Sequence, residues 1–356
     1  MLESGARRVI QMMLAVAAMA AGLMTAVFPG GPEPVTGRAG GASAVDSSAP
    51  LRLLALGDIN LGRRLGQKLL GGDTLHPWKF VADTLAAYDV VFANLESNLS
   101  DQGGRTEDPS SNTVFTGPPI AAASLKRGGI TVVSTANNHS LDFGASALRE
   151  TIALLDSAGI AHAGTSAGAP GPDVPALLTV RGYRLAFFAC TELMNDSKGK
   201  NWKRWVADAD TSRLLPAVRA ARSRADIVVV SIHGGDEYAP RASARILAFA
   251  RAAVDAGADV VLGHHPHVPY GIERRGRSVI APSLGNFVFK QPFQYWTQRS
   301  FALAVEFRRD SSGSGVREVR CMPLHVDYQP FFLNAGEEYE TVIKRVCNGS
   351  TSPSHE

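Results

Sequence analysis

The chain has 356 residues, enough for one large α/β domain or two small ones. Hydrophobic residues make up 45% of it, and the formal net charge is only +3. A field this weak gives no reason to expect a nucleic-acid partner. The 35 glycines are typical of a globular α/β protein with many short loops.

The first 50 residues are expected to lie outside the fold. Arg7 and Arg8 precede an uncharged stretch at 9–28, and a tract rich in Gly, Pro, Ser and Ala follows. This order is typical of an export signal, and the apolar run is also long enough to stay as a membrane anchor. Whether the segment is cleaved or retained stays open. Either way, the sequence predicts an exported, extracytoplasmic protein that is membrane-anchored or secreted.

The body of the chain begins with alternating strand and helix signals. Short apolar runs end in polar or glycine-rich loops, as buried parallel strands do, and helical spacing fills the intervals. Strands are predicted at 51–56, 89–93, 130–134 and 160–163, helices at 78–87, 118–127 and 145–158, and a polar surface loop at 102–113.

Later in the chain the strand signals become more frequent. Arg181-Gly182-Tyr183 indicates a hairpin turn, and Thr211 is a plausible N-cap. Because no linker divides 51–345, we expect one domain of two packed sheets with helices outside, followed by a weakly structured tail at 346–356. The remaining strands are predicted at 177–180, 184–190, 226–232, 259–262, 268–273, 278–280, 301–308 and 316–322, and the helices at 211–224 and 241–256.

The three cysteines do not form a disulfide framework by themselves. Cys190 ends an apolar strand and is predicted to be a buried thiol. Cys321 and Cys347 are both in the C-terminal region, and export would permit a disulfide between them. The sequence leaves that pairing open.

Polar side chains that suit metal binding follow most of the predicted strands. Ligands of α/β folds collect at the carboxyl ends of strands, so these side chains are expected to converge on one rim. The candidate metal ligands are Asp58, Glu96, Asn138, His233, His265 and His267, the candidate catalytic residues are His139 and Glu237, and Asn60 and His264 lie nearby.

The histidine cluster at 264–267 is the strongest sequence evidence for a metal site. Histidine occurs only nine times, yet three of these residues fall within four positions after an apolar strand. In an extended segment, His265 and His267 would point to the same face, as two ligands of one ion should. Mixed carboxylate, amide and imidazole donors suit Mn, Fe, Zn or Mg, and a carboxylate such as Glu96 could bridge two ions. A histidine that binds no metal, His139, could then protonate a leaving oxygen.

Each residue also has an interpretation without function. Asp58 could cap a helix, Asn138 could be a turn residue, and Glu96 could be a solvated charge. His233 could be an ordinary loop histidine, and an aromatic stretch at 291–296 could cover the core instead of lining a groove. Several polar clusters, each at a strand end, favour the functional interpretation.

Six segments of the chain stand in a distinctive order. They are 57–63 (GDINLGR), 94–97 (NLES), 136–144 (ANNHSLDFG), 233–238 (HGGDEY), 263–268 (GHHPHV) and 283–287 (SLGNF). Their order and spacing resemble the successive motifs of the CapA family of capsule, or poly-γ-glutamate, biosynthesis proteins. The resemblance covers about residues 51–325 and implies a calcineurin-like, four-layer α/β/β/α sandwich.

The resemblance also implies a metallophosphatase-type site with one or two divalent ions. Asp58 matches the first aspartate of the pattern, Glu96 the bridging carboxylate, and Asn138-His139 the Asn-His pair. His233, His265 and His267 match the other histidines. Asn60 stands where a ligand histidine is usual, which weakens one metal position.

The implied function is an exported protein of capsule or poly-γ-glutamate biosynthesis. Its partners would be an anionic polymer or phosphoester substrate and a membrane polymer-synthase complex. The alternative is a free-standing metal-dependent hydrolase, a phosphoesterase or γ-glutamyl amidase, that acts on an envelope polymer. A metal-free binding module is disfavoured, because buried ionisable groups without partners would cost several kcal/mol.

Overall fold

The computed structural model describes residues 49–169, 171–195, 201–311 and 313–347. The predicted leader lies outside these residues except for its last two positions, and the predicted tail lies outside them from residue 348 onward. No helix in the described part of the chain combines the length and apolar character needed to cross a bilayer.

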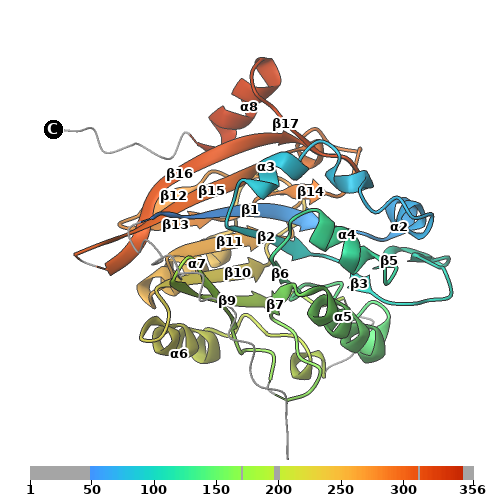
Figure 1. Ribbon diagram of the computed structural model, residues 1–356, viewed down its shortest axis with the longest axis horizontal. Coiled ribbons are helices and arrows are strands. Elements are labelled where there is room, and N and C mark those ends of the chain that lie inside the picture. The colour runs from blue at the N-terminus through green and yellow to red at the C-terminus, as the bar shows by residue number, and fades with distance from the viewer. Residues whose placement is uncertain (1–48, 170, 196–200, 312, 348–356) are drawn as a thin grey trace, which may run out of the picture. The chain divides into compact units, whose positions relative to one another are not determined.

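The first sheet brings together strands from both ends of the domain. Its order is β17-β16-β15-β1-β2-β6-β7, with β14 paired to β1. Strands β1, β2, β6, β7 and β14 are parallel, and β15 lies antiparallel beside β1, as Figure 1 shows for the blue and orange ribbons. The bounds are β1 (Leu51–Ile59), β2 (Val90–Leu95), β6 (Val132–Ser134), β7 (Ala161–Ala163), β14 (Asn286–Val288), β15 (Arg299–Asp310), β16 (Gly313–His325) and β17 (Phe331–Phe332).

The second sheet has the order β12-β13-β11-β10-β9-β8. Its central strands, β13, β11, β10 and β9, are parallel, while β8 and β12 pair antiparallel at the edges. The bounds are β8 (Ala176–Val180), β9 (Tyr183–Thr191), β10 (Ile227–His233), β11 (Val260–His264), β12 (Glu273–Arg275) and β13 (Ser278–Ala281). A small third sheet consists of β3 (Asn98–Leu99), β4 (Glu107–Asp108) and β5 (Ser111–Gly117).

The alternation of side chains along the strands builds the layers. In β1, Leu53 packs into a core shared by both sheets, whereas Leu54 joins a separate cluster with the helices outside the first sheet. In β9, Phe187 faces the shared core and Phe188 faces the helices outside the second sheet. The arrangement is therefore helix, sheet, sheet, helix, which confirms the predicted four-layer α/β/β/α sandwich.

The helices cover the outer faces of the two sheets. Helices α2 (Arg63–Leu70), α3 (Ala82–Ala86), α4 (Ala121–Arg127) and α5 (Gly144–Ala158) pack on the first sheet, and α6 (Thr211–Arg222) and α7 (Ala244–Asp255) on the second. Helix α8 (Glu337–Val346) contacts β15 and β16, and its Val342 and Val346 enter the shared core. Short 3-10 turns lie at η1 (His76–Trp78), η3 (Trp202–Arg204) and η4 (Trp296–Gln298).

Several predicted elements were wrong in detail. The predicted loop at 102–113 contains β4 and the start of β5. The predicted strand at 268–273 is irregular until β12, because the amides of Tyr270 and Ile272 donate to Ser283 and Val346 instead of to a neighbouring strand. The predicted helix at 78–87 is a 3-10 turn followed by the short α3.

Two helix starts also differ from the prediction. Asp210, not Thr211, caps α6, since its carboxylate accepts from the amide of Ser212 at 2.9 Å. Helix α7 begins at Ala244 and not at 241, with the Ser243 hydroxyl accepting from the amide of Ile246. The predicted end of α5 at Gly159 is confirmed, and this residue has the left-handed backbone that favours glycine.

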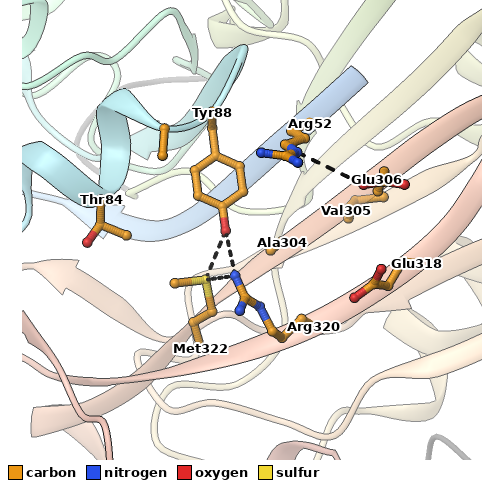
Figure 2. Close-up of a pocket in the computed structure, with 10 residues that line it drawn as sticks. Arg52, Thr84, Tyr88, Ala304, Val305, Glu306, Glu318, Arg320 and Met322 are labelled. Carbon is orange, nitrogen blue, oxygen red and sulfur yellow. Dashed lines mark hydrogen bonds and ion pairs between the residues drawn. The ribbon is translucent and has the colours of Figure 1, made fainter. Parts of the chain in front are cut away.

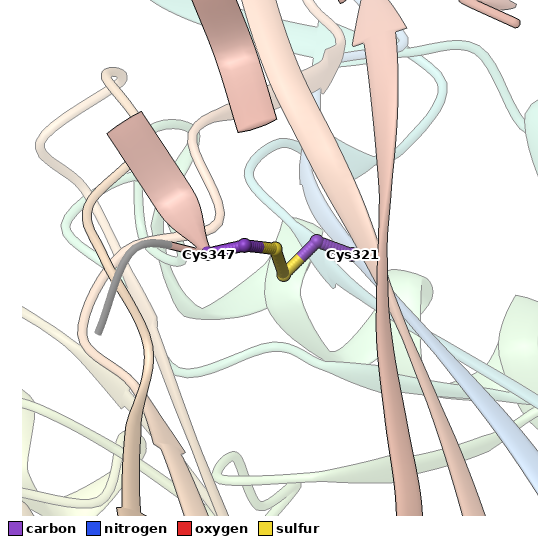
Figure 3. The surroundings of a disulfide bond; sticks show 2 residues. All are labelled: Cys321 and Cys347. Carbon is purple, nitrogen blue, oxygen red and sulfur yellow. A yellow bond between two sulfur atoms is a disulfide. The ribbon is translucent and has the colours of Figure 1, made fainter. Parts of the chain in front are cut away.

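The disulfide that the sequence left open is present. Cys321 of β16 is joined to Cys347 at the end of α8, across a sequence separation of 26 residues (Figure 3). It fastens the last helix to the sheet. Cys190 is buried and free, as predicted, and burial raises the pKa of its thiol.

Candidate metal centre

The predicted polar residues converge where the parallel strands of the two sheets end. Strands β1, β2 and β6 of the first sheet bring Asp58, Glu96 and Asn138 to this edge, and β10 and β11 of the second bring the histidines. Two glycines permit the close approach of the backbones. A Cβ on Gly57 would lie 1.9 Å from the carbonyl oxygen of Gly285, and one on Gly263 would lie 1.8 Å from that of Pro282.

Asp58 is fully buried and is bound from several sides. Its Oδ1 accepts from Asn94 Nδ2 at 2.8 Å and lies 3.0 Å from His264 Nδ1, and its Oδ2 lies 3.5 Å from His267 Nδ1. Burial alone would raise the pKa of Asp58. The hydrogen bonds of His264 and His267 outweigh burial and hold this pKa well below its usual value, so the carboxylate is ionised.

Glu96 differs from Asp58 in having a buried oxygen with no partner. Its Oε1 has no hydrogen bond, although it lies 3.7 Å from His267 Nε2, 3.8 Å from His139 Nε2 and 4.0 Å from His233 Nε2. Burial raises the pKa of Glu96 well above its usual value, and the nearby charges of Asp58 and Glu237 raise it further. A cation at this point would supply the missing partner.

The imidazoles of His233 and His265 are uncharged, which is the form that can bind a metal. Burial, with the charge of His265, lowers the pKa of His233 well below its usual value. Burial, with the charge of His267, lowers the pKa of His265 to about 3. Since only the neutral imidazole binds a metal, both side chains are in the form that a ligand needs. Nδ1 of His265 is buried and has no hydrogen-bond partner.

A neighbouring amide fixes the orientation of His267. Asn286 Nδ2 donates to Gln291 Oε1 at 3.0 Å and to the carbonyl of Thr297 at 3.1 Å. Its Oδ1 must therefore face His267 Nδ1, which lies 2.8 Å away and donates to it. This hydrogen bond leaves Nε2 of His267 as the lone-pair nitrogen on the side of Glu96, the usual support of a metal-binding histidine.

The donor atoms form two overlapping groups around Glu96. One consists of Asp58, Glu96 and His267, and the other of Glu96, His233 and His265, with the donor atoms of each group within 4.8 Å of one another. Asn138 belongs beside the second group, because its Oδ1 lies 2.8 Å from His233 Nε2. The residues thus fit one or two divalent ions, with Glu96 as the shared ligand.

His139 lies beside the donor groups with a carboxylate behind it. Its Nδ1 is 2.8 Å from Asp142 Oδ2, and its Nε2 faces Glu96. The ring stacks on Phe115 with a centroid distance of 4.3 Å. A histidine held in this way presents Nε2 as a site that can give or take a proton.

Glu237 and Asn60 are two further residues that the sequence analysis placed near the site. Glu237, a candidate catalytic residue, is exposed, and its carboxylate groups with His265 and His267 as a third set of potential metal donors. Asn60 is a turn residue, since its Oδ1 accepts from the amide of Gly62 at 2.8 Å.

Backbone strain is concentrated at this site. Among the residues that the structure describes, five that are not glycine have a positive φ, and four of them, Arg63, Tyr238, His265 and His267, lie in or beside the cluster. Such conformations persist only where surrounding contacts enforce them, and they are most common at functional sites.

Sequence reasoning missed the residues that hold the donors in place. Asn94 donates to Asp58 and contacts His233 Nδ1 at 3.2 Å, although it entered the sequence analysis only as the first residue of the segment 94–97. Asp142 orients His139, and its spacing of three residues from His139 was an available signal. Asn286 and His264 were noticed in their motifs but were given no role.

A hollow of about 480 Å³ on the outer face of the first sheet is not part of this site (Figure 2). Arg52, Tyr88, Glu306 and Arg320 line it, and Arg320 donates to the Tyr88 hydroxyl at 3.2 Å. Arg52 is at the start of β1 and Asp58 near its end, so the two places are roughly 20 Å apart along the strand. No residue of the candidate metal centre contributes to the hollow.

The four-layer α/β/β/α fold is that of a metallophosphatase-like protein, and the donor groups around Glu96 lie where its parallel strands end. The family model described as "Bacterial capsule synthesis protein PGA_cap" matches residues 52–291, and the chain belongs to this family. It is 31% identical to "PGA biosynthesis protein CapA" of Bacillus subtilis, over 83% of this chain and 77% of that protein. It is 29% identical to "Capsule biosynthesis protein CapA" of Bacillus anthracis, over 78% of this chain and 67% of that protein.

Among solved structures, the calcineurin-like phosphoesterase YfkN of Bacillus subtilis matches with a TM-score of 0.48 and 11% identity. That match covers 83% of this chain and 96% of the YfkN chain.

Proposed function

We propose that this protein is exported and takes part in the assembly of a capsule or poly-γ-glutamate polymer through a divalent-metal centre. The leader sequence at 1–50 supports export, either as a secreted or as a membrane-anchored protein. The proposed ligands are Asp58, Glu96, Asn138, His233, His265 and His267, and the donor types suit Mn, Fe, Zn or Mg.

One observation supports the metal centre above all others, namely the unpaired Oε1 of Glu96. A buried carboxylate oxygen without a hydrogen bond is costly, and the imidazole nitrogens of two proposed ligands, His267 and His233, lie 3.7 and 4.0 Å from it. Donor atoms that share one ion at about 2.1 Å each lie roughly 3 to 4 Å from one another. A shared cation would account for both the spacing and the unpaired oxygen.

A bound ion would supply Lewis-acid polarisation of a substrate oxygen at this edge of the sheets. The other functions of the site would come from side chains of the protein itself. Asp58 is held ionised, His267 is fixed in one tautomer by Asn286, and His139 is oriented by Asp142 to hold or release a proton at Nε2.

The proposed substrate is an anionic polymer or a phosphoester formed during its synthesis. The names of the Bacillus relatives refer to capsule and PGA biosynthesis, and this is the basis for proposing the same class of polymer here. We further propose that the protein works beside a membrane polymer-synthase complex, as an accessory to it.

The second candidate is a free-standing hydrolase, a phosphoesterase or a γ-glutamyl amidase. The pair of His139 and Asp142 favours it, because a histidine held by a carboxylate at 2.8 Å and facing the donor groups has the arrangement of a general acid. An accessory role alone would not need this pair.

Elemental analysis of the purified protein tests the metal centre. We expect at least one divalent ion in the wild type, a strong loss in His265→Ala, and no loss in the matched control His162→Ala, whose histidine lies outside the cluster and next to Asp156. Unchanged metal content in His265→Ala would rule out the site. A screen with a phosphodiester, a phosphomonoester and γ-glutamyl peptides then separates the two functions, since turnover by the isolated protein favours the hydrolase.

A further inference from the structure

Arg63 is a half-buried cation beside the candidate metal centre. It is the first residue of α2 and has a positive φ of 53°. Two hydrogen bonds with Thr106 hold that backbone, from Arg63 N to the Thr106 carbonyl and from Thr106 Oγ1 to the Arg63 carbonyl, both at 2.8 Å. This strained backbone fixes the position from which the Arg63 side chain extends.

The guanidinium lies on aromatic rings that also contact the site. Its Cζ is 4.5 Å from the ring centroid of Phe115 and 5.9 Å from that of Phe289. Phe115 stacks on His139, and Phe289 meets His267 edge to face at 5.0 Å. One ring therefore separates Arg63 from the proton-bearing histidine and another from a proposed metal ligand.

The hydrogen-bonding capacity of the guanidinium is largely unused. Nη2 donates to the carbonyl of Asn112, while Nε is buried and has no partner. Within the residues that the structure describes, no carboxylate forms an ion pair with Arg63. Glu107 and Glu96 act on it only at longer range, and burial lowers its pKa. A half-buried cation without a counter-ion is costly unless an anion completes it.

We infer that Arg63 binds an anionic oxygen group, phosphoryl or carboxylate, of the molecule that occupies the metal centre. The planar guanidinium presents paired donors that match both kinds of group. This inference deepens the proposed function and rests on the metal centre being the place where the substrate binds. Binding of the charged group of the substrate would also explain why Arg63 forms no ion pair with a carboxylate of the described residues.

Anion binding by titration calorimetry at low ionic strength tests the inference. The probes are inorganic phosphate and a γ-glutamyl tripeptide, which distinguish a phosphoryl from a carboxylate ligand. We expect the dissociation constant of at least one probe to rise about 10- to 100-fold in Arg63→Gln and less in Arg63→Lys, because a charged hydrogen-bond pair is lost. The matched control is Arg64→Gln, which removes the neighbouring exposed arginine.

Metal content and melting temperature are measured on the same samples. The inference predicts unchanged metal content in Arg63→Gln, since within the described part of the chain Arg63 forms no hydrogen bond or ion pair with a proposed ligand. If neither probe binds the wild type, or if Arg63→Gln and Arg64→Gln weaken binding equally, Arg63 is not an anion-binding residue. If Arg63 serves only to balance the charge of Glu107, Arg63→Gln and Glu107→Gln should lower the melting temperature equally. Neither variant would then change the anion affinity, and this result would also overturn the inference. Arg63-dependent binding in a protein that holds no metal supports the inference and refutes the metal centre.

Discussion

Glu96 Oε1 and His267 Nε2 face each other at 3.7 Å, farther apart than a hydrogen bond. His267 cannot close the gap by donating from Nε2, because its proton is on Nδ1 and is shared with Asn286. Two lone-pair atoms therefore point at one another in a buried place, which is unfavourable unless a cation lies between them. This relationship explains why the effect of Glu96 on stability should depend on metal.

Replacing Glu96 by glutamine is expected to stabilise the metal-free protein and to weaken metal binding. The pKa of Glu96 is raised by burial, so its contribution to stability is present below the ordinary carboxyl pKa and is lost as the pH rises. At pH 7 without metal, Glu96→Gln should raise the free energy of unfolding by about 1 to 3 kcal/mol. Urea unfolding in the presence of a chelator measures this difference.

With metal present the order should reverse, because the wild type gains the binding free energy of the ion and Glu96→Gln gains less. Glu318→Gln, which neutralises an exposed carboxylate on β16, is the control and should change neither value. A metal-free Glu96→Gln protein that is less stable than the wild type would mean that Glu96 has a hydrogen-bond partner in solution.

Acid should destabilise the metal-free protein through His265. Its folded pKa of about 3 is below the ordinary value of 6.5, so the unfolded chain binds a proton in this range that the folded chain does not. The stabilising contribution is therefore complete above about pH 6.5 and is lost as the pH falls toward 3, by about 5 kcal/mol at most. Unfolding free energies between pH 7 and about 4 measure it.

His265→Asn is the informative variant, because asparagine tolerates the positive φ of 96° at this position and does not titrate. We expect its pH profile to be flatter than that of the wild type, while His162→Asn, outside the site, should follow the wild type. Equal slopes for all three proteins would contradict the shifted pKa.

The candidate donor residues could be selected from the sequence because their signals are local. Scarce histidines gathered after one apolar strand, and the strand-end positions of Asp58 and Glu96 follow from the rule that parallel strands present ligands at their carboxyl ends. The supporting roles of Asn94 and Asn286 could not be predicted in this way. Asn94 contacts His233, which is 139 residues away in the sequence and in the other sheet, so only the packing of the two sheets brings them together.

The two unpredicted helices illustrate different limits. Helix α8 had a usable signal, with Glu337, Glu338 and Glu340 in its first turn and Lys344 and Arg345 in its last. Helix α2 is short, lacks an acidic residue in its first turn and contains Gly66, so its sequence resembles a loop. Gly66 is there because a Cβ would lie 2.6 Å from the Thr106 side chain, a contact that no local pattern reveals.

Replacing His139 should separate turnover from metal binding. If the protein hydrolyses a phosphodiester, His139→Gln should lower kcat by about 100-fold or more, because the leaving oxygen loses its proton donor. Asp142→Asn should cause a smaller loss, since His139 would be present but less well oriented. Metal content should stay at the wild-type level in both variants, and a loss of metal in His139→Gln would make His139 a ligand instead.

Removing the disulfide should destabilise the protein through its C-terminal helix. The link between Cys321 and Cys347 spans 26 residues, and closing a loop of this size contributes about 3 kcal/mol. Cys347→Ser should lose this amount in unfolding experiments, and reduction of the wild type should have the same effect. Adding reductant to Cys347→Ser should cause no further loss of stability.

Gly57→Ala should disrupt the metal centre without touching any donor atom. The added Cβ would lie 1.9 Å from the carbonyl oxygen of Gly285, a backbone atom that also accepts from the amide of Asp58 at 3.0 Å. Strand β14 must therefore move away from β1, and with it Asn286, which holds His267 in its tautomer. We expect a loss of about 3 kcal/mol or more in stability together with weaker metal binding, measured by unfolding and by elemental analysis. Gly171→Ala, where an added Cβ meets nothing within 4 Å, is the matched control. Normal metal content in Gly57→Ala would show that the β1–β14 register is not needed to position the donors.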